Sequence, residues 1–406
     1  PTTAAEFRET LRECIRLHLV SDVPLGVFLS SGVDSSAVAN LAQKVSPDAR
    51  IKTFTLAFEE QSLNEGQHAR AIADAIGTEH TEILLTEERF VENLERALET
   101  LDQPTFDGLN SFYMSHAVRE AGLTVALVGT GGDELFGGYT SFRFLPKLQR
   151  WDRRLGVVPR GVRIAGARLL SRLMHGSAGA VGPQTRWAKL PDMLQNADDL
   201  VALYQLAYAL FLPDFQDELM SKDGGGDDAV ALGLPAALLR RLREEIAGRS
   251  PLAALSVLEQ RCFLGERLLR DSDAASMAVS LELRVPLVDS VLTESVAGLP
   301  DALRFQPLGR KQLLRMIGLE GLDPALFERP KSGFVLPFDK WIRQRLGQAM
   351  HDTMLDESAV RAAGLHPPAV ARLWEAYQSG AAGMYWSRVW AIYVLIRWCQ
   401  RHQVTI

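Results

Sequence analysis

The sequence predicts an α/β fold: a doubly wound, mostly parallel sheet with helices on both faces, followed by further helical sequence. Over residues 20–145, short apolar runs alternate with helix-like stretches, which favours parallel strands joined by helices. Glycine-rich loops follow two of the apolar runs, after Leu29 and after Val128. Because ligands bind beyond the carboxyl ends of the strands in such sheets, these two loops are the first candidates for a functional site.

The individual elements follow from apolar spacing and from glycine punctuation. Phe7, Leu11, Cys14 and Ile15 recur near helical spacing, so we expect an amphipathic helix and a core position for the Cys14 thiol. The expected helices are 4–22, 34–45, 64–77, 87–101 and 111–122, and the expected strands are 23–29, 51–58, 80–86 and 124–128.

The second half of the chain reads as predominantly helical. We expect a helical insertion over 146–250 and a mostly helical part over 251–406 that completes the site, with helix continuing as far as Pro286. The run "SKDGGGDD" (221–228) is rich in aspartate but lacks spaced ligands, which favours a solvated loop over a metal site.

Composition narrows the class of protein. With 50 acidic and 44 basic side chains, the chain does not resemble a general nucleic-acid-binding surface. No apolar run approaches the roughly 20 residues that span a bilayer, and the densest one, 384–398, is interrupted by Arg388 and Arg397 and predicts a buried helix. The 3 cysteines are far apart and form no metal or disulfide pattern, so we expect a cytoplasmic protein that contacts neither nucleic acid nor membrane.

The first glycine-rich loop, "LSSGVDSS" (29–36), lies where a strand passes into a helix. A helix N-terminus with exposed N–H groups and hydroxyls attracts phosphate, and Gly32 permits a close backbone approach. Asp34 fits such a site when Mg²⁺ stands between its carboxylate and the phosphate oxygens. The loop lacks the lysine of a P-loop, so a simple capped turn explains it equally well on its own residues.

The second loop, "VGTGGDELFGGY" (128–139), shifts the balance toward a nucleotide site. It also follows a buried apolar run and places Asp133 beyond the end of a strand, as Asp34 is placed. Two carboxylates at one sheet edge suit a Mg²⁺-bridged pyrophosphate. Two unrelated tight turns remain the alternative interpretation.

Four motifs in order, "LSSGVDSS", "VGTGGDELFGGY", "SMAVSLELRVPLVD" and "RPKSGFVLPFDKW", resemble the synthetase domain of the glutamine-dependent asparagine synthetase family. That family is of the PP-loop ATP-pyrophosphatase type. The resemblance implies ATP and Mg²⁺ as cofactors, with the first loop holding the pyrophosphate portion of ATP. It implies nucleotide-binding roles for Leu29, Ser30, Ser31, Gly32, Asp34, Ser35, Ser36, Leu56, Gly129 and Gly131, and metal-binding roles for Asp34 and Asp133.

The resemblance also implies a catalytic set. Lys311, in "GRKQLLR", matches the catalytic lysine of the family, although an isolated "RK" on a helix is ordinarily solvated. Arg270 and Glu282 align with positions near the substrate pocket; a Glu282–Arg284 pair bracing a helix is an equal alternative for Glu282. Lys331 is expected to reach the pyrophosphate.

Two positions depart from the family pattern. Ser31 replaces a glycine, which we expect to alter loop contacts slightly because serine does not use positive φ freely. Thr130 replaces a glutamate close to the carboxylate being activated, and a hydroxyl cannot act as a carboxylate base. Thr130 therefore bears on the identity of the acceptor more than on adenylation.

The implied reaction adenylates a carboxylate, by default that of aspartate, releases pyrophosphate, and transfers ammonia to give the amide and AMP. A related enzyme that amidates another carboxylate or closes a lactam or macrolactam stays open, as does a nucleotide-binding partner module without turnover. No residue here matches the N-terminal nucleophilic cysteine of the family's glutaminase domain, so we expect that domain to be absent and expect a separate glutaminase domain or subunit if glutamine supplies the nitrogen. A homodimer is one assembly open to such a chain.

Overall fold

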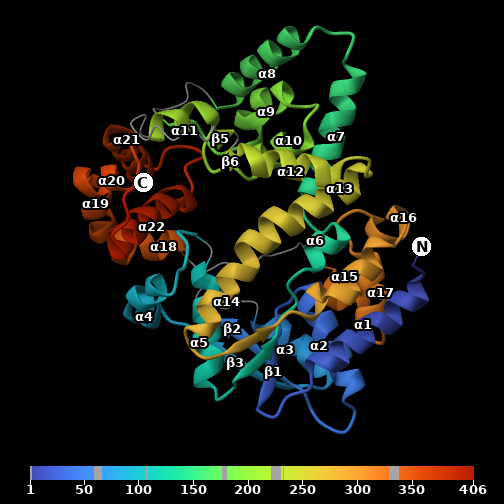
Figure 1. Ribbon diagram of the computed structural model, residues 1–406. Coiled ribbons are helices and arrows are strands. Elements are labelled where there is room, and N and C mark those ends of the chain that lie inside the picture. Colours follow the sequence, from blue (N-terminus) through green and yellow to red (C-terminus); the bar gives the residue numbers. More distant parts are fainter. Residues whose placement is uncertain are drawn as a thin grey trace. The chain divides into compact units, whose positions relative to one another are not determined.

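The computed structural model describes residues 2–58, 66–106, 108–175, 181–220, 230–231, 233–328 and 338–406 (Figure 1). Two compact units are present. Unit 1 comprises 1–102, 107–142 and 259–337, and unit 2 comprises 103–106, 143–258 and 338–406. Among the described residues, no helix combines the length and apolarity needed to cross a bilayer.

Unit 1 is built on a five-stranded sheet in the order β3-β2-β1-β4-β7, and every neighbouring pair is parallel. Its strands are β1 Leu25–Phe28, β2 Lys52–Ala57, β3 Glu79–Leu84, β4 Val125–Leu127 and β7 Glu282–Arg284. Its helices are α1 Ala4–His18, α2 Val33–Val45, α3 Gly66–Ile76, α4 Glu87–Glu99, α5 Gly108–Glu120, α6 Gly132–Phe136, η1 Glu259–Leu269, α14 Arg270–Met277, η2 Pro286–Val288, α15 Ser290–Ala297, α16 Asp301–Phe305, α17 Gln312–Gly318 and η3 Pro324–Phe327. The predicted α/β class with a parallel sheet is confirmed.

The strand order contains a reversal that positions the candidate site. The chain proceeds outward from β1 through β2 to β3, and then returns so that β4 lies on the other side of β1. Right-handed crossovers place α2 and α3 on one face, and the reversal places α5 on the opposite face. A crevice opens at such a switch point, beyond the carboxyl ends of β1 and β4. Both glycine-rich loops follow these two strands.

One prediction about the sheet was wrong. We expected helix to continue as far as Pro286, but Glu282–Arg284 form β7, the edge strand beside β4. Glu282 pairs with Val125 and Arg284 with Leu127, across more than 150 residues of sequence. The segment is only 3 residues long, and partner strands rather than its own periodicity determine its conformation.

The core of unit 1 explains why the flanking helices form. Phe7, Leu11, Cys14 and Ile15 line the buried face of α1, which begins with a capping box between Thr3 and Glu6. They pack with Val38 and Leu41 of α2 and with buried residues of α15 and α17. Cys14 is 4% exposed, so the predicted core thiol is confirmed, and burial raises its pKa to about 12.

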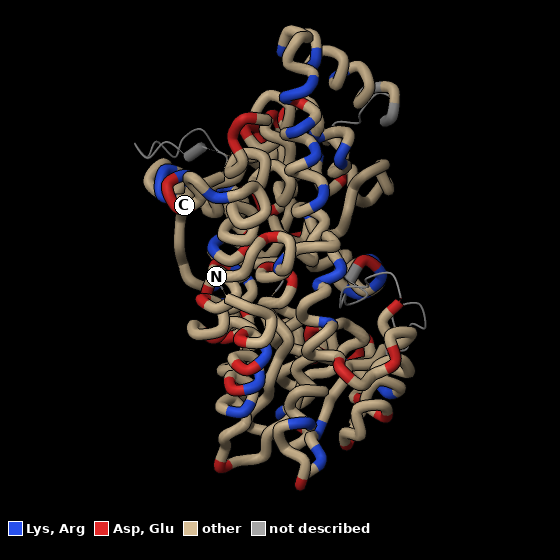
Figure 2. Tube along the Cα trace, turned by 90° about the vertical axis from the view of Figure 1, so that its right-hand side faces the viewer, with Lys and Arg blue, Asp and Glu red and all other residues tan. Residues whose placement is uncertain are grey.

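The described secondary structure of unit 2 is helical apart from one short antiparallel pair. Its elements are α7 Ser141–Arg154 (whose first two residues belong to unit 1), α8 Arg160–His175, α9 Arg186–Gln195, α10 Leu200–Tyr208, α11 Pro213–Leu219, β5 Val230–Ala231, β6 Leu234–Pro235, α12 Ala236–Ile246, α13 Pro251–Leu258, α18 Phe338–Trp341, η4 Ile342–Leu346, α19 Gly347–Leu355, α20 Glu357–Ala362, α21 Pro367–Gln378 and α22 Trp386–His402. The buried helix predicted over 384–398 is confirmed as α22. Acidic and basic positions are interspersed along most of the trace (Figure 2).

Candidate nucleotide and metal site

The loop after β1 is held by hydrogen bonds among its own serines. Ser35 Oγ accepts from the backbone N–H of Ser30 at 3.1 Å and lies 2.9 Å from Ser30 Oγ. The Gly32 N–H donates to Ser30 Oγ at 3.1 Å, and Ser36 Oγ donates to the Gly32 carbonyl at 2.8 Å. These bonds fix the turn from β1 into α2. The first turn of α2 therefore lies at the carboxyl end of β1.

Gly32 and Ser31 adopt ordinary backbone conformations in this turn. Gly32 has φ −81° and ψ 154°. Ser31 is not among the described non-glycine residues with positive φ, which are Ser280, Lys311 and Gln403. Serine at position 31 therefore costs the loop no backbone strain.

The loop after β4 approaches the first loop so closely that side chains are excluded. A Cβ on Gly129 would lie 2.5 Å from the Ser35 backbone nitrogen, and one on Gly132 would lie 2.4 Å from Asp34 Oδ1. Gly131 has φ +108°, in the region that favours glycine. Glycine at positions 129 and 132 therefore lets the second loop pack directly against the backbone at Ser35 and the carboxylate of Asp34.

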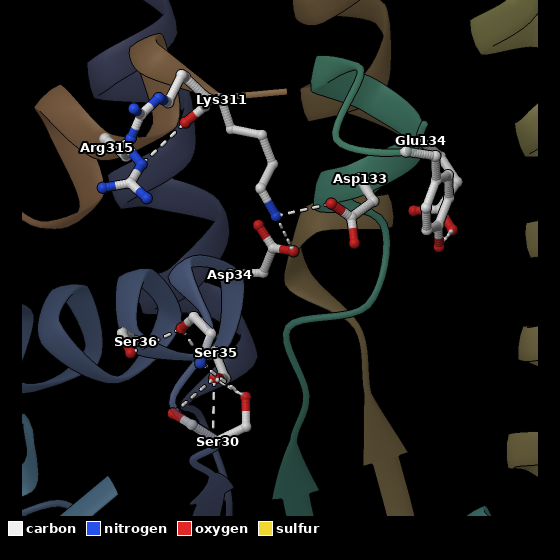
Figure 3. Close-up of polar contacts among 11 residues, drawn as sticks. Ser30, Asp34, Ser35, Ser36, Asp133, Glu134, Lys311 and Arg315 are labelled. Carbon is white, nitrogen blue, oxygen red and sulfur yellow. Dashed lines mark hydrogen bonds and ion pairs between the residues drawn. The ribbon is translucent and has the colours of Figure 1, made fainter. Parts of the chain in front are cut away.

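Lys311 joins the two loops. Its Nζ donates to Asp34 Oδ2 at 2.6 Å and to Asp133 Oδ1 at 2.8 Å (Figure 3). The lysine side chain is 8% exposed, and the two carboxylates are 17% and 14% exposed. Burial alone would lower the pKa of Lys311, but the carboxylates of Asp34 and Asp133 outweigh it and raise the pKa above its ordinary value.

Lys311 occupies an unusual backbone conformation. Its φ of +51° and ψ of +47° are left-handed, and it directly precedes α17. Non-glycine residues adopt this region at a cost that surrounding contacts must offset. Here the conformation accompanies the extension of the side chain toward both aspartates. Its neighbour Arg315 donates to the Arg310 and Phe327 carbonyls, the first of which is drawn in Figure 3.

Glu134 lies next to this cluster but faces elsewhere. It is 1% exposed and accepts a 2.7 Å hydrogen bond from the Tyr139 hydroxyl. Burial raises its pKa to about 7, against the opposing effect of the Tyr139 bond. Glu134 and Tyr139 stand close together in the glycine-rich segment "GGDELFGGY", and this closeness was the sequence feature that could have suggested the pair.

The structure brings most, but not all, of the predicted site residues together. Leu29 and Leu56 are buried beside the first loop, where the Leu29 N–H bonds the Phe54 carbonyl at 2.8 Å. Thr130 lies between Gly129 and Gly131 in the second loop, partly exposed. Lys331 falls outside the described residues, as does the 221–228 loop.

Glu282 and Arg270 lie apart from the lysine–aspartate cluster. Glu282 begins β7 in register with Val125, so it lies toward the amino end of the sheet rather than at the loops. Its carboxylate accepts from Arg284 Nε at 2.7 Å, and Arg284 also donates to the His18 carbonyl at 2.8 Å. This pair on a strand matches the bracing alternative for Glu282, and its catalytic role stays a prediction. Arg270 pairs with Glu266 at 3.2 Å on an exposed helical surface.

The donor set of the cluster fits Mg²⁺. Two carboxylate oxygens from separate loops converge on one cationic atom, and Mg²⁺ is typically bound by one or two carboxylates together with substrate phosphates. The described residues contain no group of three or more metal-ligating side chains, so any metal held here would need further oxygens from a ligand or from water.

Comparisons with known proteins identify which family this chain resembles. A family model described as "Asparagine synthase" matches residues 6–400. The chain is 26% identical over 99% of its length to asparagine synthetase (glutamine-hydrolysing) 1 of Bacillus subtilis (strain 168), and covers 59% of that protein. It is 30% identical over 97% of its length to a Mycobacterium bovis protein provisionally named a glutamine-hydrolysing asparagine synthetase, of which it covers 57%. It is also 25% identical over 76% of its length to a Penicillium rubens protein named amidase chyE, of which it covers 48%. The chain thus spans less than two thirds of the length of these relatives.

Proposed function

The chain belongs to the asparagine synthase family, and from this premise we propose that it is the synthetase part of an ATP-dependent, amide-forming ligase. The reaction joins a carboxylate to the α-phosphorus of ATP, releases pyrophosphate, and then transfers an amine to the acyl carbon with loss of AMP. The observation that carries the proposal is the convergence of Asp34, Asp133 and Lys311 at the switch point of the sheet.

The nucleotide lies, in this proposal, across the carboxyl ends of β1 and β4. The N-terminus of α2 and the hydroxyls of Ser30 and Ser35 bind the pyrophosphate portion, because N–H groups and the helix dipole favour negative charge there, while the buried Ser36 hydroxyl holds the turn through the Gly32 carbonyl. Leu29 and Leu56 provide the buried apolar contact for the adenine ring. Gly129 and Gly132 keep the second loop close enough to complete the cradle, and Gly131 supplies the left-handed turn between them.

Asp34 and Asp133 would hold the metal, and Lys311 supplies a positive charge beside them. Mg²⁺ at the two carboxylates would neutralise phosphate oxygens and orient the pyrophosphate as a leaving group. The Lys311 ammonium, with its raised pKa, stays protonated and stabilises charge that builds on the α-phosphate and on the acyl centre. The protein otherwise contributes by positioning its substrates.

Thr130 is the observation that favours a second candidate function. Aspartate is the default acceptor and ammonia the default amine, with glutamine as the nitrogen source if a glutaminase domain or subunit takes part. Thr130 stands where the family has a glutamate, so a related enzyme acting on another carboxylate, or closing a lactam or macrolactam, is the alternative. The relative named as an amidase is consistent with divergent substrates within the family.

A pyrophosphate-release screen tests the proposal. The chain is incubated with Mg·ATP, ammonium and a panel of carboxylic acids that includes aspartate. We expect release with at least one acid, formation of AMP, and loss of release in Asp34→Asn. ATP binding without release for any acid would favour the nucleotide-binding module, and unchanged release in Asp34→Asn would refute the assigned metal ligand.

A further inference from the structure

The ammonium of Lys311 contacts both of the carboxylates that would hold a metal ion. It lies within hydrogen-bond distance of one oxygen from each aspartate, at 2.6 Å from Asp34 and 2.8 Å from Asp133. Mg²⁺ would need carboxylate oxygens at about 2.0–2.1 Å. A divalent cation and an ammonium cannot both occupy the space between the same two oxygens, because they would repel each other at close range.

Charge compensation explains why the Lys311 ammonium lies against the two carboxylates. Two carboxylates in close proximity and largely out of water destabilise each other unless a cation compensates them. The side chains of Asp34 and Asp133 are 17% and 14% exposed, and Lys311 contacts both of them. Arg315, in α17, bonds backbone carbonyls instead and does not contact the carboxylates.

The backbone at Lys311 is a second, independent observation. Its left-handed conformation directly before α17 is one of only three such non-glycine conformations among the described residues. Such conformations persist where surrounding structure holds them, and they are common in segments that switch between two states. The salt bridges to the two loops are contacts that can hold it in the nucleotide-free protein.

We propose that Lys311 is an internal counter-cation that competes with free metal for Asp34 and Asp133, so that the metal enters efficiently only together with the nucleotide. This proposal rests on the proposed function, since it needs the two aspartates to be the metal ligands. When Mg·ATP binds, its phosphates provide a new partner for the ammonium, and the lysine moves from the aspartates to the phosphates. One side chain thereby couples metal entry to nucleotide entry.

Metal binding by the nucleotide-free chain tests this competition. Mn²⁺ is titrated into the full chain without ATP and followed by electron paramagnetic resonance. We expect weak binding by the wild type and at least about tenfold tighter binding by Lys311→Met, because a nearby positive charge has been removed. Lys311→Arg keeps the charge and stays close to the wild type. Arg315→Met, which removes a cation that does not contact the carboxylates, changes the affinity by less than about threefold.

A thermal-unfolding series guards against a variant that folds poorly. In EDTA, Lys311→Met leaves two half-buried carboxylates without the lysine cation and melts below the wild type; Mn²⁺ raises its Tm by more than it raises that of the wild type. Lys311→Gln gives the same comparison if the methionine variant does not fold. A double variant, Lys311→Met with Asp34→Asn, loses the gain in Mn²⁺ affinity.

The outcomes separate the two levels of the proposal. Equal Mn²⁺ affinity in the wild type and in Lys311→Met, with tight binding in both, overturns the competition and leaves the metal site standing. An absence of bound Mn²⁺ in both proteins even with ATP overturns the metal site itself, and with it the proposed function of the aspartates.

Discussion

Two buried lysines, one in each unit, show how partner chemistry decides what a buried charge can do. Counted as whole residues, Lys311 in unit 1 and Lys189 in unit 2 are each 7% exposed. Lys311 contacts two carboxylates, whereas Lys189 Nζ donates to the Ala207 and Ala209 carbonyls at 2.9 and 2.7 Å. The pKa of Lys311 is raised, and burial lowers the pKa of Lys189 to about 8, with nearby Arg388 adding to the effect.

The difference separates Lys311, proposed for the chemistry, from Lys189, which satisfies backbone carbonyls. Carbonyl oxygens satisfy the donors of Lys189 and the carboxyl end of α10, but they carry no net charge to balance the ammonium. The carboxylates of Asp34 and Asp133 balance Lys311 and themselves require a cation. Burial disfavours the protonated state of both lysines, and only at Lys311 do neighbouring carboxylates outweigh that effect.

The largest expected effect separates the two lysines by activity. Lys311→Ala should lower pyrophosphate release by about 100-fold or more, because it removes a charge placed for the transition state. Lys189→Met should leave the rate within a few-fold, because its contacts all lie in the carbonyl cap of α10. Steady-state pyrophosphate release measures both, and a wild-type rate in Lys311→Ala would reassign that lysine to a structural role.

A smaller effect is expected where the loops meet in unit 1. Gly132→Ala places a Cβ 2.4 Å from Asp34 Oδ1, so the loop or the carboxylate must shift. We expect a loss of about 1–3 kcal/mol in the free energy of unfolding, together with weaker nucleotide binding. Denaturant unfolding and nucleotide titration measure the two effects. Wild-type values for both would show that the loops are not packed as closely as the structure has them.

The sequence was sufficient for the local parts of this architecture. Strands near β1, β2, β3 and β4 follow from apolar runs, and both loops follow from glycine and serine beside those runs. The core position of Cys14 and the burial of α22 followed from helical spacing in the same way.

Contacts between distant segments were beyond such patterns. The β7 strand is too short to have a period of its own, and its pairing with Val125–Leu127 depends on the rest of the fold. Lys311 is 277 residues from Asp34 and 178 from Asp133, so no spacing rule joins them; family resemblance named the three residues but not their mutual contact. The left-handed backbone at Lys311 likewise has no sequence signal, because lysine carries no preference for it.

The lowered pKa of Lys189 predicts a pH dependence of stability in unit 2. Between about pH 8 and the ordinary lysine pKa near 10.5, the unfolded chain binds this proton and the folded chain does not, so stability rises with pH there. Below pH 8 both states are protonated and the penalty is constant. Relative to Lys189→Met, the wild type should gain about 1–2 kcal/mol between pH 8 and pH 10. Unfolding curves of both proteins across this range measure the difference, and a constant difference would mean that Lys189 titrates normally.

The smallest expected effect concerns a glycine of unit 2 that, unlike Gly132, has open space around it. Gly166 lies inside the exposed helix α8, and a Cβ there would meet nothing within 4 Å. Gly166→Ala should stabilise the protein by about 0.5–1 kcal/mol, because alanine loses less backbone entropy in a helix. Opposite signs for Gly132→Ala and Gly166→Ala in the same unfolding assay would show that close approach, rather than glycine as a residue type, makes the loop intolerant. Destabilisation by Gly166→Ala would instead indicate that the surface of α8 is in contact with something in solution.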